Sequence, residues 1–119
     1  MAKETMKSIL LVDDDEYVLI ALERLLEGEG YRTETAWSAQ EALELSQKAD
    51  FDLLLVDEHL HGADVNTLLD ELKQNQPNAT PFLMCTRKLR PDHALTKSPA
   101  ICKWEHGEVK ARIRRHFAA

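Results

Sequence analysis

Long apolar runs, cysteines and repeated segments are all scarce in this chain of 119 residues. No apolar stretch approaches the roughly 18 residues that a membrane-spanning helix needs, so we expect no membrane association. The first residues, MAKETMKS, lack the apolar segment of a secretory signal. These absences together predict a protein of the cytoplasm.

The chain has just two cysteines, Cys85 and Cys102. They form neither a CxxC pair nor the cysteine and histidine spacing of a zinc site. Reduced thiols in the core are the usual state of such residues in a cytoplasmic protein. The length fits one domain, and we expect residues 1–119 to form it without linkers or low-complexity segments.

Acidic residues exceed basic ones, 21 to 15, and give a net charge of −6. The two signs are unevenly placed, since the balance is −12 over residues 1–86 and +6 over residues 87–119. A basic end suggests nucleic-acid contact. A solvated last helix whose cations complement its dipole explains the same charges, and we predict no direct nucleic-acid binding.

Short apolar runs alternate with amphipathic patterns along the whole chain. Runs such as SILLV and FDLLLVD suit strands that are buried on both faces of a parallel sheet. The order of the segments predicts an α/β fold with helices on both faces. We expect strands at 8–12, 31–37, 51–57, 81–86 and 100–104, and helices at 16–27, 39–48, 64–74 and near the end of the chain.

The fourth crossover is unusually short. Residues 87–102 must hold both the crossover and part of the fifth strand, and Pro91 and Pro99 enclose just seven residues. Proline does not fit inside a helix, and the residue before it avoids helical angles. We therefore predict that the fourth helix is shortened or missing.

Polar residues stand where the expected strands end. Asp13 and Asp14 follow the first strand, Asp57 ends the third, Thr86 ends the fourth and Lys103 belongs to the fifth. The carboxyl ends of parallel strands meet at one edge, where α/β proteins bind ligands. Carboxylate oxygens suit Mg²⁺, which offsets the repulsion between neighbouring aspartates. The sequence therefore predicts a magnesium site at this edge.

The segments ILLVDDDE, DLLLVDEHLHGAD, FLMCT and EVKARIRRHF resemble the receiver domain of two-component response regulators over nearly the whole chain. The resemblance implies a flavodoxin-like, doubly wound, five-stranded parallel sheet with strand order 2-1-3-4-5. It also implies a phosphoprotein of phosphorelay signalling, and no enzyme acting on external substrates. Its partners are expected to be a sensor histidine kinase or phosphotransfer protein and an effector that the sequence does not identify.

The same resemblance assigns roles to residues at matching positions. Asp57 is expected to take a phosphoryl group from a phosphohistidine and become an aspartyl phosphate. Asp13 and Asp14 are expected to hold Mg²⁺ together with Asp57 and the backbone carbonyl of His59.

The resemblance also assigns two residues to the phosphoryl group itself. The Thr86 hydroxyl and the Lys103 ammonium are expected to contact phosphoryl oxygens. Lys97 is an alternative to Lys103, because Trp104 stands where receivers usually have a proline.

Two further departures from the pattern of the receiver family suggest an alternative function. Ala100 replaces the expected switch aromatic, and Arg87 stands where the family keeps a small residue. These departures suit a degenerate receiver that binds a protein without being phosphorylated. A less favoured alternative is a small haloacid-dehalogenase-type phosphatase, because Asp13 and Asp15 also form a DxD pair after a strand.

Overall fold

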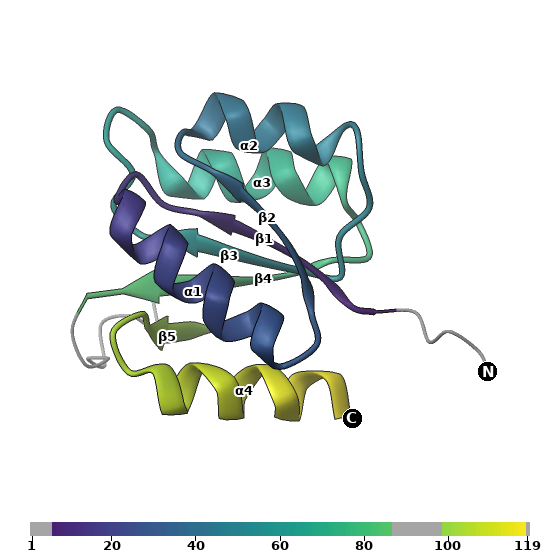
Figure 1. Ribbon diagram of the computed structural model, residues 1–119. Helices are drawn as coiled ribbons and strands as arrows, with labels where there is room; N and C mark the ends of the chain where they lie inside the picture. Colours follow the sequence, from purple (N-terminus) through teal and green to yellow (C-terminus); the bar gives the residue numbers. More distant parts are fainter. Residues whose placement is uncertain (1–5, 87–98, 119) are drawn as a thin grey trace.

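Five parallel strands form one sheet in the computed structural model, which describes residues 6–86 and 99–118 (Figure 1). The strand order is β2-β1-β3-β4-β5, which confirms the predicted 2-1-3-4-5 arrangement. The strands are β1 (Ser8–Val12), β2 (Arg32–Ala36), β3 (Leu53–Asp57), β4 (Thr80–Cys85) and β5 (Ala100–Cys102).

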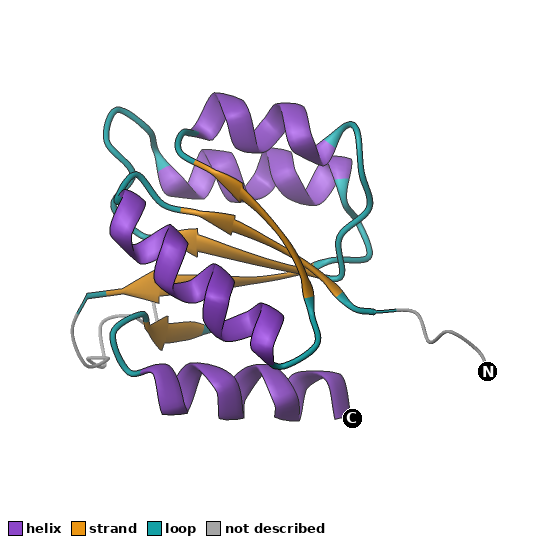
Figure 2. Ribbon diagram, in the orientation of Figure 1, coloured by secondary structure: helices purple, strands orange, loops and turns teal. Residues whose placement is uncertain are grey.

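Four helices of the described residues cover the two faces of the sheet. Helices α2 and α3 lie together on one face, and α1 and α4 lie on the other (Figures 1 and 2). Their bounds are α1 (Glu16–Gly28), α2 (Ala39–Ser46), α3 (Val65–Asn75) and α4 (His106–Ala118). None of them is long and apolar enough to cross a membrane.

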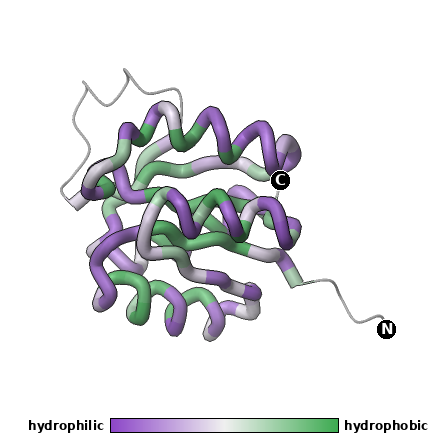
Figure 3. The backbone as a smooth tube through the Cα atoms, turned by 90° about the horizontal axis from the view of Figure 1, so that it is seen from above, coloured by the Kyte–Doolittle hydropathy of each residue, from purple (hydrophilic) through white to green (hydrophobic). Residues whose placement is uncertain are grey.

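Alternation along the strands divides the core into two layers. In β1, Leu10 and Val12 pack toward α2 and α3, while Ile9 and Leu11 pack toward α1 and α4. Strand β3 is buried along its whole length, because it lies inside the sheet and has helices on both faces. In Figure 3 the hydrophobic green of the central strands contrasts with the hydrophilic purple of the outer helix turns.

The structure confirms the predicted elements within a few residues, with small differences at their ends. The second helix ends at Ser46 and not at residue 48, and the fifth strand covers only Ala100–Cys102. The fourth crossover, where a shortened or missing helix was predicted, falls on residues 87–98, outside the described residues.

Candidate functional site

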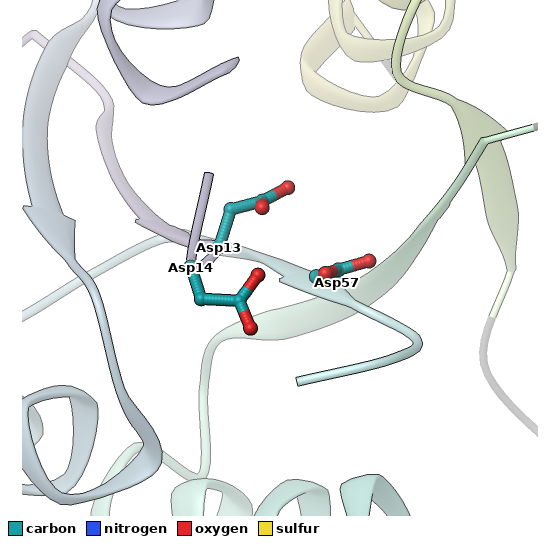
Figure 4. Close-up of side chains that lie close together, drawn as sticks. All are labelled: Asp13, Asp14 and Asp57. Atoms are coloured by element: carbon teal, nitrogen blue, oxygen red, sulfur yellow. The ribbon is translucent and has the colours of Figure 1, made fainter. Parts of the chain in front are cut away.

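Three aspartates meet at the carboxyl edge of the sheet. Strands β1 and β3 are neighbours, with Val12 opposite Val56. Asp13 and Asp14 follow β1 directly, and Asp57 is the last residue of β3, so this register places them side by side (Figure 4). One carboxylate oxygen from each of the three lies within 4.8 Å of those of the other two.

Lys103 enters this acidic group from the end of β5. Its Nζ donates a hydrogen bond to Asp13 Oδ2 at 2.8 Å and lies 3.4 Å from Asp57 Oδ1. All three residues are buried, with exposed fractions of 4% for Lys103, 0% for Asp13 and 4% for Asp57. Lys97, the alternative to Lys103 as the lysine of the site, lies outside the described residues.

One ammonium does not balance the buried negative charge. Burial raises the pKa of Asp13, and the charge of Asp57 adds to this rise, although the hydrogen bond from Lys103 opposes it. Burial by itself lowers the pKa of Lys103, but its hydrogen bond to Asp13 and the charges of Asp13 and Asp57 outweigh burial and raise it. Lys103 is therefore held as a cation, while the carboxylates still lack positive charge.

This imbalance fits a divalent cation. Three carboxylates that face one another provide oxygen ligands of the kind that Mg²⁺ prefers, and Asp14 is exposed, which leaves room for water ligands. Burial is the main cause of the raised pKa of Asp13, and a cation between the carboxylates would offset the charge of Asp57 that adds to it. The donor set of this edge therefore fits the predicted metal.

The loop after β3 closes one side of the acidic group. The backbone amide of His61 donates to Asp14 Oδ2 at 2.9 Å, and the amide of His59 lies 3.4 Å from Asp57 Oδ1. Gly62, with a φ of 74°, allows the turn that follows. The predicted use of the His59 carbonyl as a metal ligand stays a prediction.

Thr86 lies at the same edge, one residue beyond β4. It is exposed, and its backbone carbonyl is 3.9 Å from the Sγ of Cys102. The structure thus brings Thr86 to the edge that holds the carboxylates. The predicted contact of its hydroxyl with a phosphoryl group stays a prediction.

Asp15 does not join the acidic group. It is the N-cap of α1, and its Oδ1 accepts from the amide of Tyr17 at 2.9 Å. Its own amide donates to Asp13 Oδ1 at 2.9 Å, which orients that carboxylate. The DxD reading of Asp13 and Asp15 needs both side chains in the site, so this geometry gives the phosphatase alternative no support.

Two features of the site were missed by sequence reasoning. Lys103 was expected to meet a phosphoryl oxygen, and its hydrogen bond to Asp13 was not predicted. The amide of His61 was not expected to bind Asp14. A backbone amide carries no signal in the sequence, whereas a lysine at a strand end beside three aspartates could have indicated the first contact.

Comparison with known proteins agrees with this fold. The family model of the response regulator receiver domain matches residues 9–98. The alkaline phosphatase synthesis transcriptional regulatory protein PhoP of Bacillus subtilis (strain 168) is 33% identical over 120 aligned positions, which cover 92% of this chain and 49% of that protein. The chain thus spans about half the length of this curated relative.

Two solved structures are also similar. A CheY-like receiver domain protein from Methanospirillum hungatei JF-1 has a TM-score of 0.82 and 24% identity, over 94% of each chain. A response regulator from Burkholderia pseudomallei, solved with a phosphorylated aspartic acid, calcium ion and citrate, has a TM-score of 0.66 and 32% identity, over 69% of this chain and 48% of that one. The chain belongs to the response regulator receiver domain family of two-component signalling.

Proposed function

We propose that Asp57 accepts a phosphoryl group from a phosphohistidine of a sensor histidine kinase or phosphotransfer protein, with Mg²⁺ bound beside it. One observation carries the proposal. The Asp57 carboxylate, at the carboxyl end of the central strand β3, shares a site with Asp13 and Asp14 and lies 3.4 Å from the Lys103 ammonium. This arrangement has the nucleophile, the metal ligands and the cation that phosphoryl transfer requires.

In the proposed step, an oxygen of Asp57 attacks phosphorus from the side opposite the imidazole of the donor. The P–N bond breaks, and an acyl phosphate forms on Asp57. Lys103 already lies beside Asp57, so its ammonium neutralises phosphoryl oxygens as they approach. Thr86, on the next strand end, offers a hydroxyl to another phosphoryl oxygen.

Asp13, Asp14 and Asp57, with the His59 carbonyl, would hold Mg²⁺. The bound cation supplies charge neutralisation, which lets an anionic carboxylate meet an anionic phosphoryl group. The amides of Asp15 and His61 hold the Asp13 and Asp14 carboxylates in place by hydrogen bonds. The Burkholderia relative, with its phosphorylated aspartic acid and calcium ion, supports the same pairing of modification and divalent cation.

The domain would then be a signalling module that catalyses its own phosphorylation and dephosphorylation, and acts on no external substrate. We place it in the cytoplasm, where its kinase and its effector meet it. Added phosphoryl charge changes the surface that the effector reads. We propose a protein as this effector and no direct contact with nucleic acid.

Intact mass spectrometry after incubation with acetyl phosphate and Mg²⁺ tests the proposal. We expect one added phosphoryl group in the wild type, none in Asp57→Asn, and one in the control Asp50→Asn, whose side chain is exposed. Omission of Mg²⁺ should abolish the addition. If the wild type gains no phosphoryl group and beryllofluoride with Mg²⁺ leaves its thermal midpoint unchanged, the chain is a degenerate receiver and the proposal is wrong.

A further inference from the structure

The two cysteines of the chain lie directly opposite each other on neighbouring strands. Cys85, the last residue of β4, pairs in register with Cys102, the last residue of β5. Neither forms a disulfide in the structure, and both are buried. Since these are the chain's only cysteines, this register gives each thiol one intramolecular partner.

Both side chains leave the sheet on the same face. Leu83 and Cys85 pack in the layer shared with α2 and α3, and so does Ala100. Met84 and Ile101 pack in the opposite layer. Because side chains alternate along a strand, Cys102 points to the same side as Ala100 and therefore as Cys85.

The spacing of paired strands suits a disulfide. Neighbouring strands lie about 4.8 Å apart, which falls within the range of about 4.4–6.8 Å between the Cα atoms of bridged cysteines. The Cβ atoms must approach to about 3.8 Å, so closure draws the strand ends together by roughly 1 Å. β5 has only three residues and is an edge strand among those described, so such a shift breaks few contacts.

We propose that Cys85 and Cys102 are an oxidisable dithiol, which a hydroperoxide converts into a disulfide that ties β5 to β4 beside the acidic site. Cys102 is the first target, because it is more exposed than Cys85, 7% against 1%. Burial and the neighbouring Glu58 carboxylate raise the pKa of Cys85 to about 12, so this thiol stays protonated and reacts second.

The chemistry balances in two steps. The Cys102 sulfur attacks the peroxide, the O–O bond breaks, and a sulfenic acid and an alcohol (or water) form. The Cys85 sulfur then attacks the Cys102 sulfur, and its proton leaves with the hydroxyl group as water. The dithiol loses two electrons, and the peroxide gains them.

The disulfide acts on the residues that follow the two cysteines. Thr86 follows Cys85, and Lys103, which holds Asp13 and Asp57, follows Cys102. A shift of roughly 1 Å at a reacting centre slows a reaction by up to about a hundredfold. This regulatory part rests on the proposed function, and we expect the oxidised chain to accept phosphoryl groups about tenfold more slowly.

Peroxide treatment of the native chain, followed by denaturation and alkylation, tests the dithiol. We expect the wild type to lose two hydrogen atoms and to bind no alkylating reagent, with the peptides of Cys85 and Cys102 found linked. Cys85→Ser and Cys102→Ser should form no internal bridge. Three results would overturn the proposal. Both thiols could remain open to alkylation, or Cys102 could be oxidised beyond the sulfenic acid while Cys85 is still alkylated. In the third, disulfides form only between separate chains.

The regulatory part has its own readout. The rate of phosphoryl uptake from acetyl phosphate should fall on oxidation and recover with a dithiol reductant, while Cys85→Ser under the same treatment keeps its rate. An oxidised wild type with an unchanged rate would leave the disulfide standing and overturn its effect on the site. A reduced wild type without any uptake would instead contradict the proposed function.

Discussion

At the scale of single residues, Lys103 decides the electrostatics of the site. It is the one cation that the described residues place within salt-bridge distance of the Asp13 and Asp57 carboxylates. Removing one partner of a buried ion pair leaves uncompensated charge, which costs more than the pair contributes. The lysine therefore stabilises the metal-free site, in addition to its proposed contact with the phosphoryl group.

Lys103→Met should lower the free energy of unfolding without metal by about 3 kcal/mol, because the buried carboxylates lose their counter-ion. Urea unfolding at neutral pH measures this change. The exposed Lys48, changed to methionine, is the matched control and should alter stability by less than about 0.5 kcal/mol. A loss below about 1 kcal/mol in Lys103→Met would contradict this role. Added Mg²⁺ should restore part of the stability that Lys103→Met loses.

Much of the acidic site follows from the sequence, because strand ends are visible in it. Asp13, Asp14 and Asp57 follow apolar runs, and a parallel sheet brings such positions to one edge. Lys103 was preferred, but Lys97 stayed an alternative, because Trp104 stands where receivers usually have a proline. The amide contact of His61 with Asp14 was beyond prediction, because loop backbone conformation leaves little trace in residue types.

At the scale of elements, Gln76 joins the ends of two helices. Its side chain is buried, and its Nε2 donates to the carbonyls of Ser46 at 2.8 Å and Ala49 at 2.5 Å. Its Oε1 accepts from the amide of Phe51 at 3.0 Å. One residue after α3 thus fixes the end of α2 and the entry to β3, the strand that carries Asp57.

Gln76→Leu keeps the approximate volume but leaves three backbone groups without this partner. Each such group costs about 1–3 kcal/mol when it stays buried, so we expect stability to fall by about 2–4 kcal/mol, with partial rescue by water. Thermal and urea unfolding measure the loss. Gln74→Leu, at an exposed position of α3, is the control, and equal effects of the two changes would argue against the role of Gln76.

Tyr31 couples the turn after α1 to the end of α4. Its ring lies 5.5 Å from that of Phe117, centroid to centroid. Burial, with help from the charge of Glu29, raises its pKa above the ordinary value of 10.0. The unfolded chain therefore releases this proton at lower pH than the folded chain, so stability is lost as pH rises through 10.0 toward the higher pKa of the folded state.

Tyr31→Phe should consequently reduce the fall in unfolding free energy above pH 10, since no hydroxyl remains to titrate. Denaturant unfolding at a series of alkaline pH values gives the slope. Tyr17→Phe serves as the control, because Tyr17 is 80% exposed, and its slope should match the wild type. An unchanged slope in Tyr31→Phe would show that other groups cause the alkaline loss.

The elements were predicted well, and their ends less well, for reasons that lie in long-range contacts. Periodicity located the second helix, but it ends at Ser46, whose carbonyl accepts a hydrogen bond from the side chain of Gln76, thirty residues later in the chain. The fifth strand ends at Cys102 because the chain turns there, with the amide of Glu105 bonded to the Cys102 carbonyl. Local patterns carry neither contact.

At the scale of the whole molecule, excess acidic charge gathers in the part that carries the proposed metal ligands. The balance over residues 1–86 is −12, and their carboxylates at the ends of β1 and β3 face one another. A cation that binds only the folded chain stabilises it according to its concentration. Metal binding should thus be visible in global stability.

Saturating Mg²⁺ should raise the thermal midpoint by several degrees, since about 2.7 kcal/mol is gained at a hundred times the dissociation constant. NaCl of equal ionic strength should have a smaller effect. Asp14→Asn removes one ligand charge but keeps an oxygen that can accept from the amide of His61, so it should abolish most of the rise with little loss of metal-free stability. An equal rise in wild type and Asp14→Asn would place the cation elsewhere.

The central claim is that Asp57 is the phosphoacceptor, and one measurement tests it most directly. After acetyl phosphate and Mg²⁺, borohydride reduces an acyl phosphate to the alcohol and so converts the modified aspartate into homoserine, which peptide mass mapping locates. Our account predicts homoserine at position 57 alone, and none when Mg²⁺ is withheld. Homoserine at Asp13 or Asp14 with Asp57 unchanged would contradict it.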